Sequence, residues 1–240
     1  MPEYFELAPP LHLADTVECL WVMRHSTGSA VQHRVLPDGC ADILFTAGLG
    51  KSTLGVVGAL TRFEDVQLLP GQLLVGLRFH PGMWATQVGV PADLITDRLP
   101  SLEEFWGQRA RTLLARLEDA RSPEDCATVL AQSVRCNHSA TPLQRALAWM
   151  RARHGVVSLD QVARQTGLSL RQFRRLCWQH TGLSPKMLAR ILRFRHAFSR
   201  VHNEAGEHAS LAADCGYFDQ SHFIAEFQRF SGRTPAAFRR

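Results

Sequence analysis

Residues 161–173 read QVARQTGLSLRQF, and this stretch decides the fold of the C-terminal part of the chain. The small Ala163 lets two helices cross closely, Gly167 can take the positive φ angle of a tight turn, and Phe173 can anchor a second helix in a core. The pattern predicts a helix-turn-helix motif over about 158–180.

Two Ser-x-x-Gln pairs support this prediction. Ser158 with Gln161, and Ser169 with Gln172, have the spacing of capping boxes, in which each serine begins a helix. The two predicted helix starts are only 11 residues apart, so the first helix is short and a glycine turn follows it.

The same layout occurs twice. In both copies Ala to Gly is four residues, Phe to Gly is nine and Gly to Pro is three, while Gly to Phe is six residues in the first copy and seven in the second. The matching positions are Ala163, Gly167, Phe173, Gly182 and Pro185, and then Ala212, Gly216, Phe223, Gly232 and Pro235. We therefore predict a second helix-turn-helix over about 208–230, and one linker helix over about 185–202 between the copies.

The stretch DCGYFDQSH, residues 214–222, resembles a metal or catalytic cluster when its letters are taken alone. Cys215, Asp219 and His222 would share a face of a continuous helix. Gly216 marks a turn, however, so the helix is interrupted and the three side chains cannot share one face. We predict no metal site here, and we expect Asp219 to cap the helix that follows.

Charge is distributed unevenly along the chain. Residues 1–140 contain 11 Lys and Arg against 16 Asp and Glu, whereas residues 141–240 contain 16 against 6. Residues 151–200 alone carry a net charge of +10, but residues 201–240 carry −1. The asymmetry indicates an acidic module joined to one that meets a polyanion.

At this point the sequence resembles a known family. GYFDQSHFIAEFQRFSGRTPAAFRR, at the C-terminus, is similar to the C-terminal signature of AraC/XylS-type bacterial transcription regulators, and SLDQVARQTGLSLRQFRRLCWQHTGLSP is similar to their first helix-turn-helix. The resemblance covers about residues 141–240. Cys177 departs from it, because an aromatic residue is usual there. The resemblance implies sequence-specific binding to double-stranded DNA, with RNA polymerase as a further partner.

The second helix of each motif would enter the major groove with its N-terminal residues on base edges. Arginines there favour guanine, and glutamine can pair with adenine. We expect most of the salt-dependent affinity from the first copy. The predicted DNA contacts are Ser169, Arg171, Gln172, Arg174, Arg175, Arg193, Gln220, Ser221, His222, Arg229 and Arg233.

The N-terminal half has a different pattern. Six short apolar segments between about 17 and 80 are separated by turn signals such as PDG and PGQ, which is typical of a small barrel or sandwich. Helical patterns follow over about 82–135, beginning with the capping box of Ser101 and Glu104 and then Ser122-Pro123. Residues 136–141 form the predicted linker.

These patterns predict an α+β chain of two domains. Residues 1–135 would form a small β-barrel or cupin-like domain with flanking helices, for effector sensing or dimerisation. Residues 142–240 would form an all-α domain of two helix-turn-helix units joined by a linker helix.

LPDGCADILF, and the segment from VGLRFHPG to EEFWG, are similar to an uncharacterised N-terminal domain of some AraC-type regulators. That resemblance implies a sensory or dimerising role and names no ligand. Polar residues near strand ends or turns would surround the mouth of a ligand cavity. The predicted effector-binding residues are His33, Arg34, Asp38, Cys40, Arg78, His80 and Trp84.

Two other classes of function remain open at this stage. A redox or metal sensor could use Cys40 with His33 or His80, although zinc usually needs four close ligands and no such spacing occurs. An enzyme fused to the same DNA-binding domain would need clustered cysteines or a nucleophile–base motif, and neither is evident. We predict a regulator that is not an enzyme and needs no cofactor or metal.

Location and assembly follow from the same features. The chain contains no apolar run of about 18 residues and no signal-peptide layout, so we expect a cytoplasmic protein that does not enter a membrane. The six cysteines are scattered, which is typical of reduced thiols. A homodimer is possible, but no clear heptad pattern indicates it.

Overall fold

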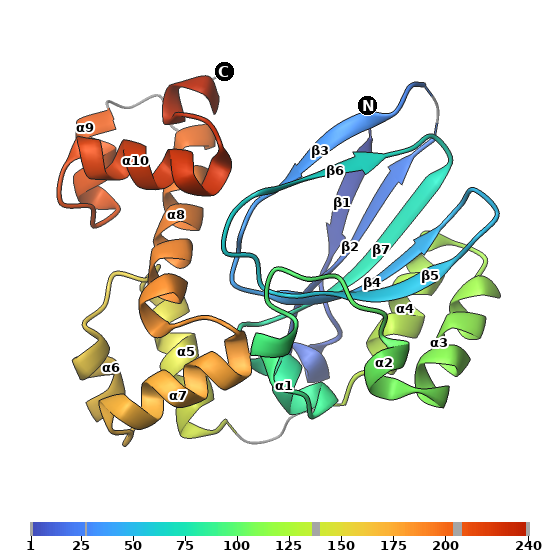
Figure 1. Ribbon diagram of the computed structural model, residues 1–240, viewed down its shortest axis with the longest axis horizontal. Helices are drawn as coiled ribbons and strands as arrows, with labels where there is room; N and C mark the ends of the chain where they lie inside the picture. The colour runs from blue at the N-terminus through green and yellow to red at the C-terminus, as the bar shows by residue number, and fades with distance from the viewer. Residues whose placement is uncertain (1, 27, 136–139, 204–207, 239–240) are drawn as a thin grey trace.

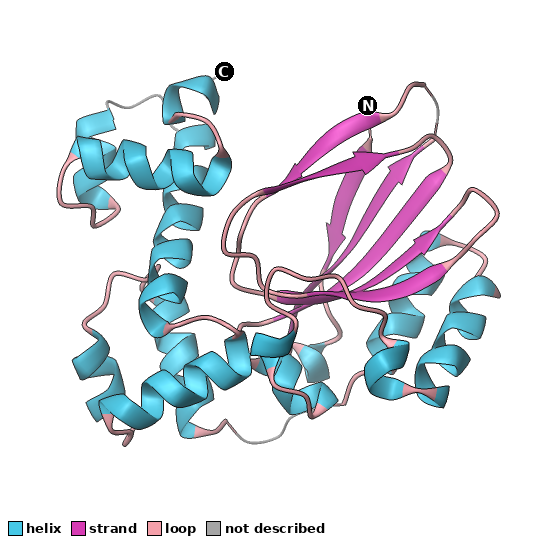
Figure 2. Cartoon of the chain, viewed as in Figure 1, coloured by secondary structure: helices cyan, strands magenta, loops and turns pink. Residues whose placement is uncertain are grey.

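A computed structural model describes residues 2–26, 28–135, 140–203 and 208–238, and shows two domains of different class (Figures 1 and 2). The N-terminal part is built on antiparallel strands with helices beside them, and the C-terminal part is entirely helical. The predicted two-domain α+β fold is confirmed. Most of the predicted linker, residues 136–139, lies outside the described residues.

Seven strands form two sheets. Five of them pair in the order β1-β2-β7-β4-β5, and the other two form a separate ribbon, β3-β6, so the strands pair as an open sheet plus a ribbon. The strands are β1 Glu3–Leu7, β2 Val17–His25, β3 Val31–Val35, β4 Ala41–Ala47, β5 Thr53–Val57, β6 Glu64–Leu68 and β7 Gln72–Phe79. Each of the six segments expected as a strand is one, and β1 is an addition to them.

The two faces of the five-stranded sheet have different neighbours. One face, with Ile43, Val75 and Leu77 fully buried, packs against helices that follow the sheet in the sequence. Those helices are α1 Met83–Val88, η2 Ala92–Leu94, α2 Glu103–Trp106, α3 Gln108–Glu118 and α4 Pro123–Gln132. The other face carries Trp21 and Met23, which pack against Leu68 of the ribbon.

The helical segment after residue 101 is divided into two helices. Gly107 adopts φ 50° and ψ −124°, and this break separates α2 from α3. Glu104 Oε1 accepts a hydrogen bond from the Ser101 backbone N–H at 3.1 Å, so half of the expected capping box is present. Ser122 caps α4 by accepting from the Asp125 N–H, with Pro123 in the first helical position, as predicted.

The C-terminal domain consists of two helix pairs on either side of a long helix. The first pair follows α5 Pro142–Ala152 and comprises α6 Leu159–Gln165 and α7 Leu170–Thr181. The long helix is α8 Pro185–Asn203, and the second pair is α9 His208–Asp214 and α10 Gln220–Ser231, followed by η3 Pro235–Phe238. A single apolar core that includes Phe173, Phe194 and Phe227 joins these helices.

The two halves of the chain are in direct contact. Leu36 and Ala59 of the N-terminal domain belong to the apolar core of the C-terminal domain. A Cβ on Gly39 would lie only 2.7 Å from Leu188 of α8, so the chain approaches α8 closely there. Figure 1 shows α1 lying between the sheet and α7.

Candidate nucleic-acid interface

The two helix pairs share their turn chemistry. Gly167 and Gly216 both adopt φ 75°, which a side chain would disfavour. The N–H of Leu168 donates to the Ala163 carbonyl at 3.0 Å, and the N–H of Tyr217 donates to the Ala212 carbonyl at 2.9 Å. These equivalent bonds show that the repeat found in the sequence is a repeat of structure.

The second helix of each pair also ends in the same way. The hydroxyls of Thr181 and Ser231 each donate to the carbonyl four residues earlier, in both cases at 2.7 Å. A glycine with positive φ, Gly182 or Gly232, then closes the helix. Cys177 is fully buried at the position where the second copy has Phe227, so it belongs to the core.

Side-chain caps fix the start of α7 and of α10. Ser169 accepts from the N–H of Gln172, whose side chain in turn accepts from the Ser169 N–H, so the predicted capping box is complete. Asp219 Oδ1 accepts from the N–H of His222 at 2.7 Å, as expected of an N-cap. Such caps stabilise a helix start by about 1 kcal/mol each.

The outward faces of the two helices differ in charge. On α7, Phe173 and Cys177 face the core, and Arg171, Arg174 and Arg175 are exposed beside the exposed Gln172. On α10, Gln220 and Ser221 are exposed and His222 is half-buried. Arg229 and Arg233 are exposed farther along. The cationic surface is therefore concentrated on the first helix pair.

Figure 1 shows how the two helices are presented. α10 crosses the upper part of α8, α7 lies at its lower end, and the N-terminal ends of α7 and α10 lie on the side away from the sheet. α8 has 19 residues and is about 28 Å long. The structure therefore brings the exposed starts of α7 and α10 to one side of the molecule, separated by most of the length of α8.

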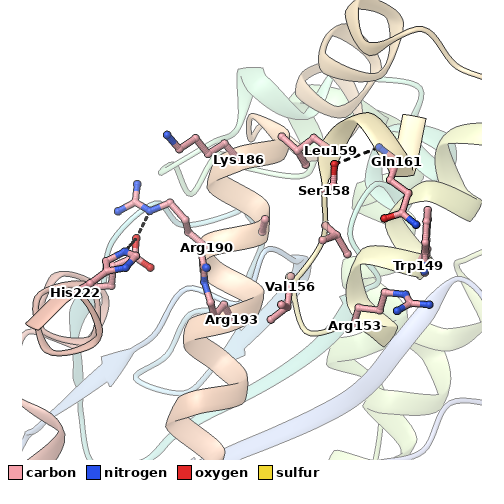
Figure 3. Close-up of a pocket in the computed structure, with 14 residues that line it drawn as sticks. Trp149, Arg153, Val156, Ser158, Leu159, Gln161, Lys186, Arg190, Arg193 and His222 are labelled. Atoms are coloured by element: carbon pink, nitrogen blue, oxygen red, sulfur yellow. Dashed lines mark hydrogen bonds and ion pairs between the residues drawn. The ribbon is translucent and has the colours of Figure 1, made fainter. Parts of the chain in front are cut away.

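A groove of about 750 Å³ lies between the two helix pairs (Figure 3). One wall is the segment from Gly155 to Leu159 together with α5, the other is the start of α10, and α8 lies between them. Arg153 and Lys186 line it with Ser158 and Gln161, so its rim presents cations and hydrogen-bond donors. These groups can contact a phosphate backbone. Sequence reasoning had not selected Arg153 or Lys186, although the net charge of residues 151–200 pointed to this region.

Two residues that were predicted to contact DNA have protein partners in this groove. Arg193 donates through Nη1 to the Gly216 carbonyl at 2.9 Å, which braces the second turn against α8. His222 Nε2 lies 3.8 Å from Glu226 Oε1, and the same buried carboxylate forms an ion pair with Arg190. Both residues thus support the architecture of the second helix pair.

The predicted effector residues do not form one cluster. Arg78 Nε lies 3.2 Å from Asp38 Oδ2 and 3.4 Å from Asp42 Oδ1, and Asp42 Oδ2 also accepts from the Trp21 indole N–H at 2.8 Å. Cys40 lies beside this group, because its N–H donates to Asp38 Oδ1 at 2.9 Å. The residues brought together are therefore Asp38, Cys40 and Arg78, with Asp42 and Trp21, which had not been selected.

The other predicted effector residues lie elsewhere. Arg34 pairs with Asp65 at 2.5 Å and donates to the Ser231 carbonyl at 3.0 Å, so it faces the C-terminal domain. His33, its neighbour on β3, points to the opposite face of the ribbon. His80 bonds to the Ala14 carbonyl at 3.1 Å, and Trp84 lies in the core between Phe79 and Phe105.

Cys40 is buried and its thiol donates to Glu18 Oε2 at 3.1 Å. Burial raises the pKa of this thiol well above its ordinary value, which keeps it protonated and weakly nucleophilic. Among the residues that the structure describes, no three His, Cys, Asp or Glu side chains gather so that they could hold a metal ion. In the same part of the chain, no helix is both long and apolar enough to span a bilayer.

Comparison with known proteins gives a family match for each half of the chain. Residues 5–101 match a domain of unknown function (DUF6597), and residues 162–240 match a helix-turn-helix domain. The HTH-type transcriptional activator RhaS of Escherichia fergusonii is 29% identical over 149 residues, which are 55% of this chain and 54% of that protein. The C-terminal domain is similar to AraC-type DNA-binding domains. The chain spans about half the length of the curated relatives it matches.

Solved structures give further matches. An AraC-type regulator from Chromobacterium violaceum is 26% identical, covers 41% of this chain and 88% of its own, and has a TM-score of 0.39. The DNA-binding domain of AdpA in complex with a target DNA is 24% identical over 41% of this chain and 90% of its own, at 0.39. ToxT of Vibrio cholerae is 10% identical over 90% of this chain and 98% of its own, at 0.43. RhaS, the Chromobacterium violaceum protein and AdpA are named as transcription regulators.

Proposed function

We propose that this chain is a sequence-specific DNA-binding transcription regulator that inserts α7 and α10 into adjacent major-groove segments. The observation that carries the proposal is the presentation of two equivalent, capped helix starts on one side of α8. Recognition helices one turn of B-DNA apart are separated by about 34 Å, which a rod of about 28 Å can bridge. One chain would then read two half-sites on one face of the duplex.

The surface chemistry supports the assignment of roles. Arg171, Arg174 and Arg175 can each bind guanine O6 and N7, and Gln172 and Gln220 can pair with adenine. The cationic rim of the groove, with Arg153 and Lys186, would follow the phosphate backbone between the half-sites. Arg229 and Arg233 would add phosphate contacts, whereas Arg193 and His222 would act by positioning the second helix pair.

Modulation by a small molecule forms the second part of the proposal. The ribbon-side face of the sheet holds a partly buried guanidinium, Arg78, with two carboxylates and an indole, and such convergent polar groups are typical of ligand sites. A polar effector that replaced Asp38 or Asp42 as the partner of Arg78 would rearrange this face. RNA polymerase and a second copy of the chain are further proposed partners, with the cytoplasm as the place of action.

Selection of bound DNA from a random pool, with the full chain, tests the proposed function. We expect a bipartite site whose half-elements are about 10 base pairs apart. Retention of every sequence equally would contradict it. Native mass spectrometry of the purified protein then tests the effector, and an extra mass that is lost in Arg78→Ala but kept in Arg24→Ala would locate it at the Arg78 cluster.

A further inference from the structure

The turn of the second helix pair contains one residue more than the turn of the first. The backbone bonds from Leu168 to Ala163 and from Tyr217 to Ala212 place Leu168 and Tyr217 at equivalent positions. In the first copy the N-cap, Ser169, follows at once, but in the second copy Phe218 intervenes before the N-cap Asp219. Phe218 is therefore the inserted residue that makes the Gly-to-Phe spacing seven instead of six.

This inserted side chain has no structural task in the described fold. Phe218 is 91% exposed, whereas its neighbour Tyr217 is 5% exposed and packs near Phe223 with ring centroids 5.2 Å apart. Burial of a phenylalanine side chain in a core or an interface normally stabilises the fold or the complex. Exposure alone does not indicate a partner, because Leu11 is also exposed; Phe218 is distinguished by its inserted position in the turn before α10.

The position of Phe218 identifies the partner. It directly precedes Asp219, whose side chain fixes the first turn of α10, and the next two residues, Gln220 and Ser221, are exposed. In a helix-turn-helix motif the start of the second helix is the part that meets base edges. Phe218 therefore extends, by one apolar side chain, the surface that α10 would present to DNA.

Charge explains why an apolar contact is needed there. The second copy lies in a segment, residues 201–240, with net charge −1, so long-range attraction to phosphate is weak. An apolar side chain in the major groove recognises the 5-methyl group of thymine, which no other base presents. We propose that Phe218 contacts a thymine methyl group in the second half-site and so gives α10 a base preference that does not depend on charge. This inference rests on the proposed function.

A cycle of one protein change and one DNA change tests the contact. The DNA is the bipartite site obtained by selection, with each thymine of the second half-site replaced in turn by deoxyuridine, which removes only the methyl group. We expect Phe218→Ala to weaken binding about tenfold, and one deoxyuridine to weaken binding of the unchanged protein about fourfold, as for one methyl group returned to water. The same deoxyuridine should leave the affinity of Phe218→Ala unchanged.

Control variants separate this effect from loss of fold. Phe218→Leu keeps an apolar side chain and should retain most of the affinity and part of the methyl sensitivity. Leu11→Ala removes another exposed apolar side chain, 95% exposed in the N-terminal domain, and should change neither. The thermal unfolding midpoint of Phe218→Ala should equal that of the unchanged protein, because the side chain is exposed.

The outcomes distinguish this inference from the function on which it rests. If selection yields no preferred sequence, the proposed function itself fails. If selection yields a bipartite site but Phe218→Ala binds it with unchanged affinity, the inference is overturned while the function stands. The inference is also overturned if Phe218→Ala and the unchanged protein lose equal affinity at every deoxyuridine, or if only association with polymerase or with a second copy changes.

Discussion

At the scale of single residues, Asp42 shows how burial sets the chemistry of the Arg78 cluster. Burial raises the pKa of this carboxyl to about 6 from an ordinary value of 3.8, although Arg78 and the Trp21 indole both favour the charged form. Trp21 in turn requires Gly76, because a Cβ there would lie 2.0 Å from the indole ring. The tight packing that excludes water from this face is therefore also what makes Asp42 titrate near neutrality.

A dependence of stability on pH follows from that pKa. Between about pH 6 and pH 4 the folded chain holds a proton on Asp42 that the unfolded chain releases. The contribution of Asp42 to the free energy of unfolding therefore increases as the pH falls through this range. Above pH 6 the carboxyl is charged in both states, and its burial opposes folding. We expect the free energy of unfolding of the wild type, relative to that of Asp42→Asn, to increase from pH 7 to pH 5. Urea denaturation of both proteins at the two pH values measures this.

Both proteins share the other carboxylates, so the difference between their free energies of unfolding isolates the contribution of the Asp42 carboxyl. Glu118→Gln, which changes an exposed carboxylate on α3, is the matched control and should show no such difference. Identical changes with pH in Asp42→Asn and in the wild type would mean that Asp42 titrates at its ordinary value.

At the scale of elements, α7 and α10 are structural equivalents with unequal charge. The three exposed arginines of α7 have no counterpart in the first turn of α10, where Gln220 and Ser221 are neutral. We therefore expect α7 to supply most of the affinity that depends on salt, and α10 to add sequence preference.

Variants on the two helices test this division. Arg171→Ala with Arg175→Ala should nearly abolish binding, because each arginine contributes about 1–3 kcal/mol. Gln220→Ala should weaken binding much less. Gel-shift titrations at several salt concentrations give the slope of log K against log salt. In the arginine variant this slope should be shallower by about 0.9 for each phosphate that the variant no longer neutralises. In Gln220→Ala the slope should be unchanged. Equal effects from the two helices would contradict the asymmetry.

Local patterns predicted most of the elements correctly. The caps at Ser169 and Asp219, and the six strand segments, depend on neighbouring residues and can be inferred from short stretches. The break at Gly107 was missed, because the helical periodicity continues through it. β1 was also missed, because a strand at a sheet edge is defined by its partner, here β2.

The candidate ligand site could be predicted only in part. Asp38, Cys40 and Arg78 do meet, but their grouping depends on the register of β4 and β7, which pairs Asp42 with Arg78. Arg34 and Trp84 were grouped with them from their positions near strand ends, yet one faces the other domain and the other lies in the core. Contacts between domains are set by tertiary packing, which leaves no signal in a short stretch of sequence.

At the scale of the whole molecule, the N-terminal domain contacts the C-terminal end of the second helix in both helix pairs. The Thr96 hydroxyl donates to the carbonyl of Gly182, at the end of α7, at 3.1 Å. Arg34 donates to the carbonyl of Ser231, at the end of α10, and a Cβ on Gly232 would lie 2.8 Å from the Phe63 ring. The domain thus holds the C-terminal ends of α7 and α10, and these contacts restrict how far one helix pair can turn relative to the other.

Removing both contacts should loosen the spacing of DNA that the protein accepts. Thr96→Val with Arg34→Ala removes the two hydrogen bonds between the domains, which contribute about 1 kcal/mol each, together with the bonds of Arg34 to Asp65. The preference for the best half-site spacing over spacings one base pair shorter or longer should therefore fall by up to about thirtyfold. Binding titrations with three operators that differ only in spacing measure that preference. Arg24→Ala, which removes an exposed ion pair with Glu3 on the same domain, is the control and should keep the full preference. An unchanged spacing preference in the double variant would show that α8 alone sets the separation of α7 and α10. A reduced spacing preference would identify Thr96 and Arg34 as contacts through which an effector on the N-terminal domain can alter DNA binding.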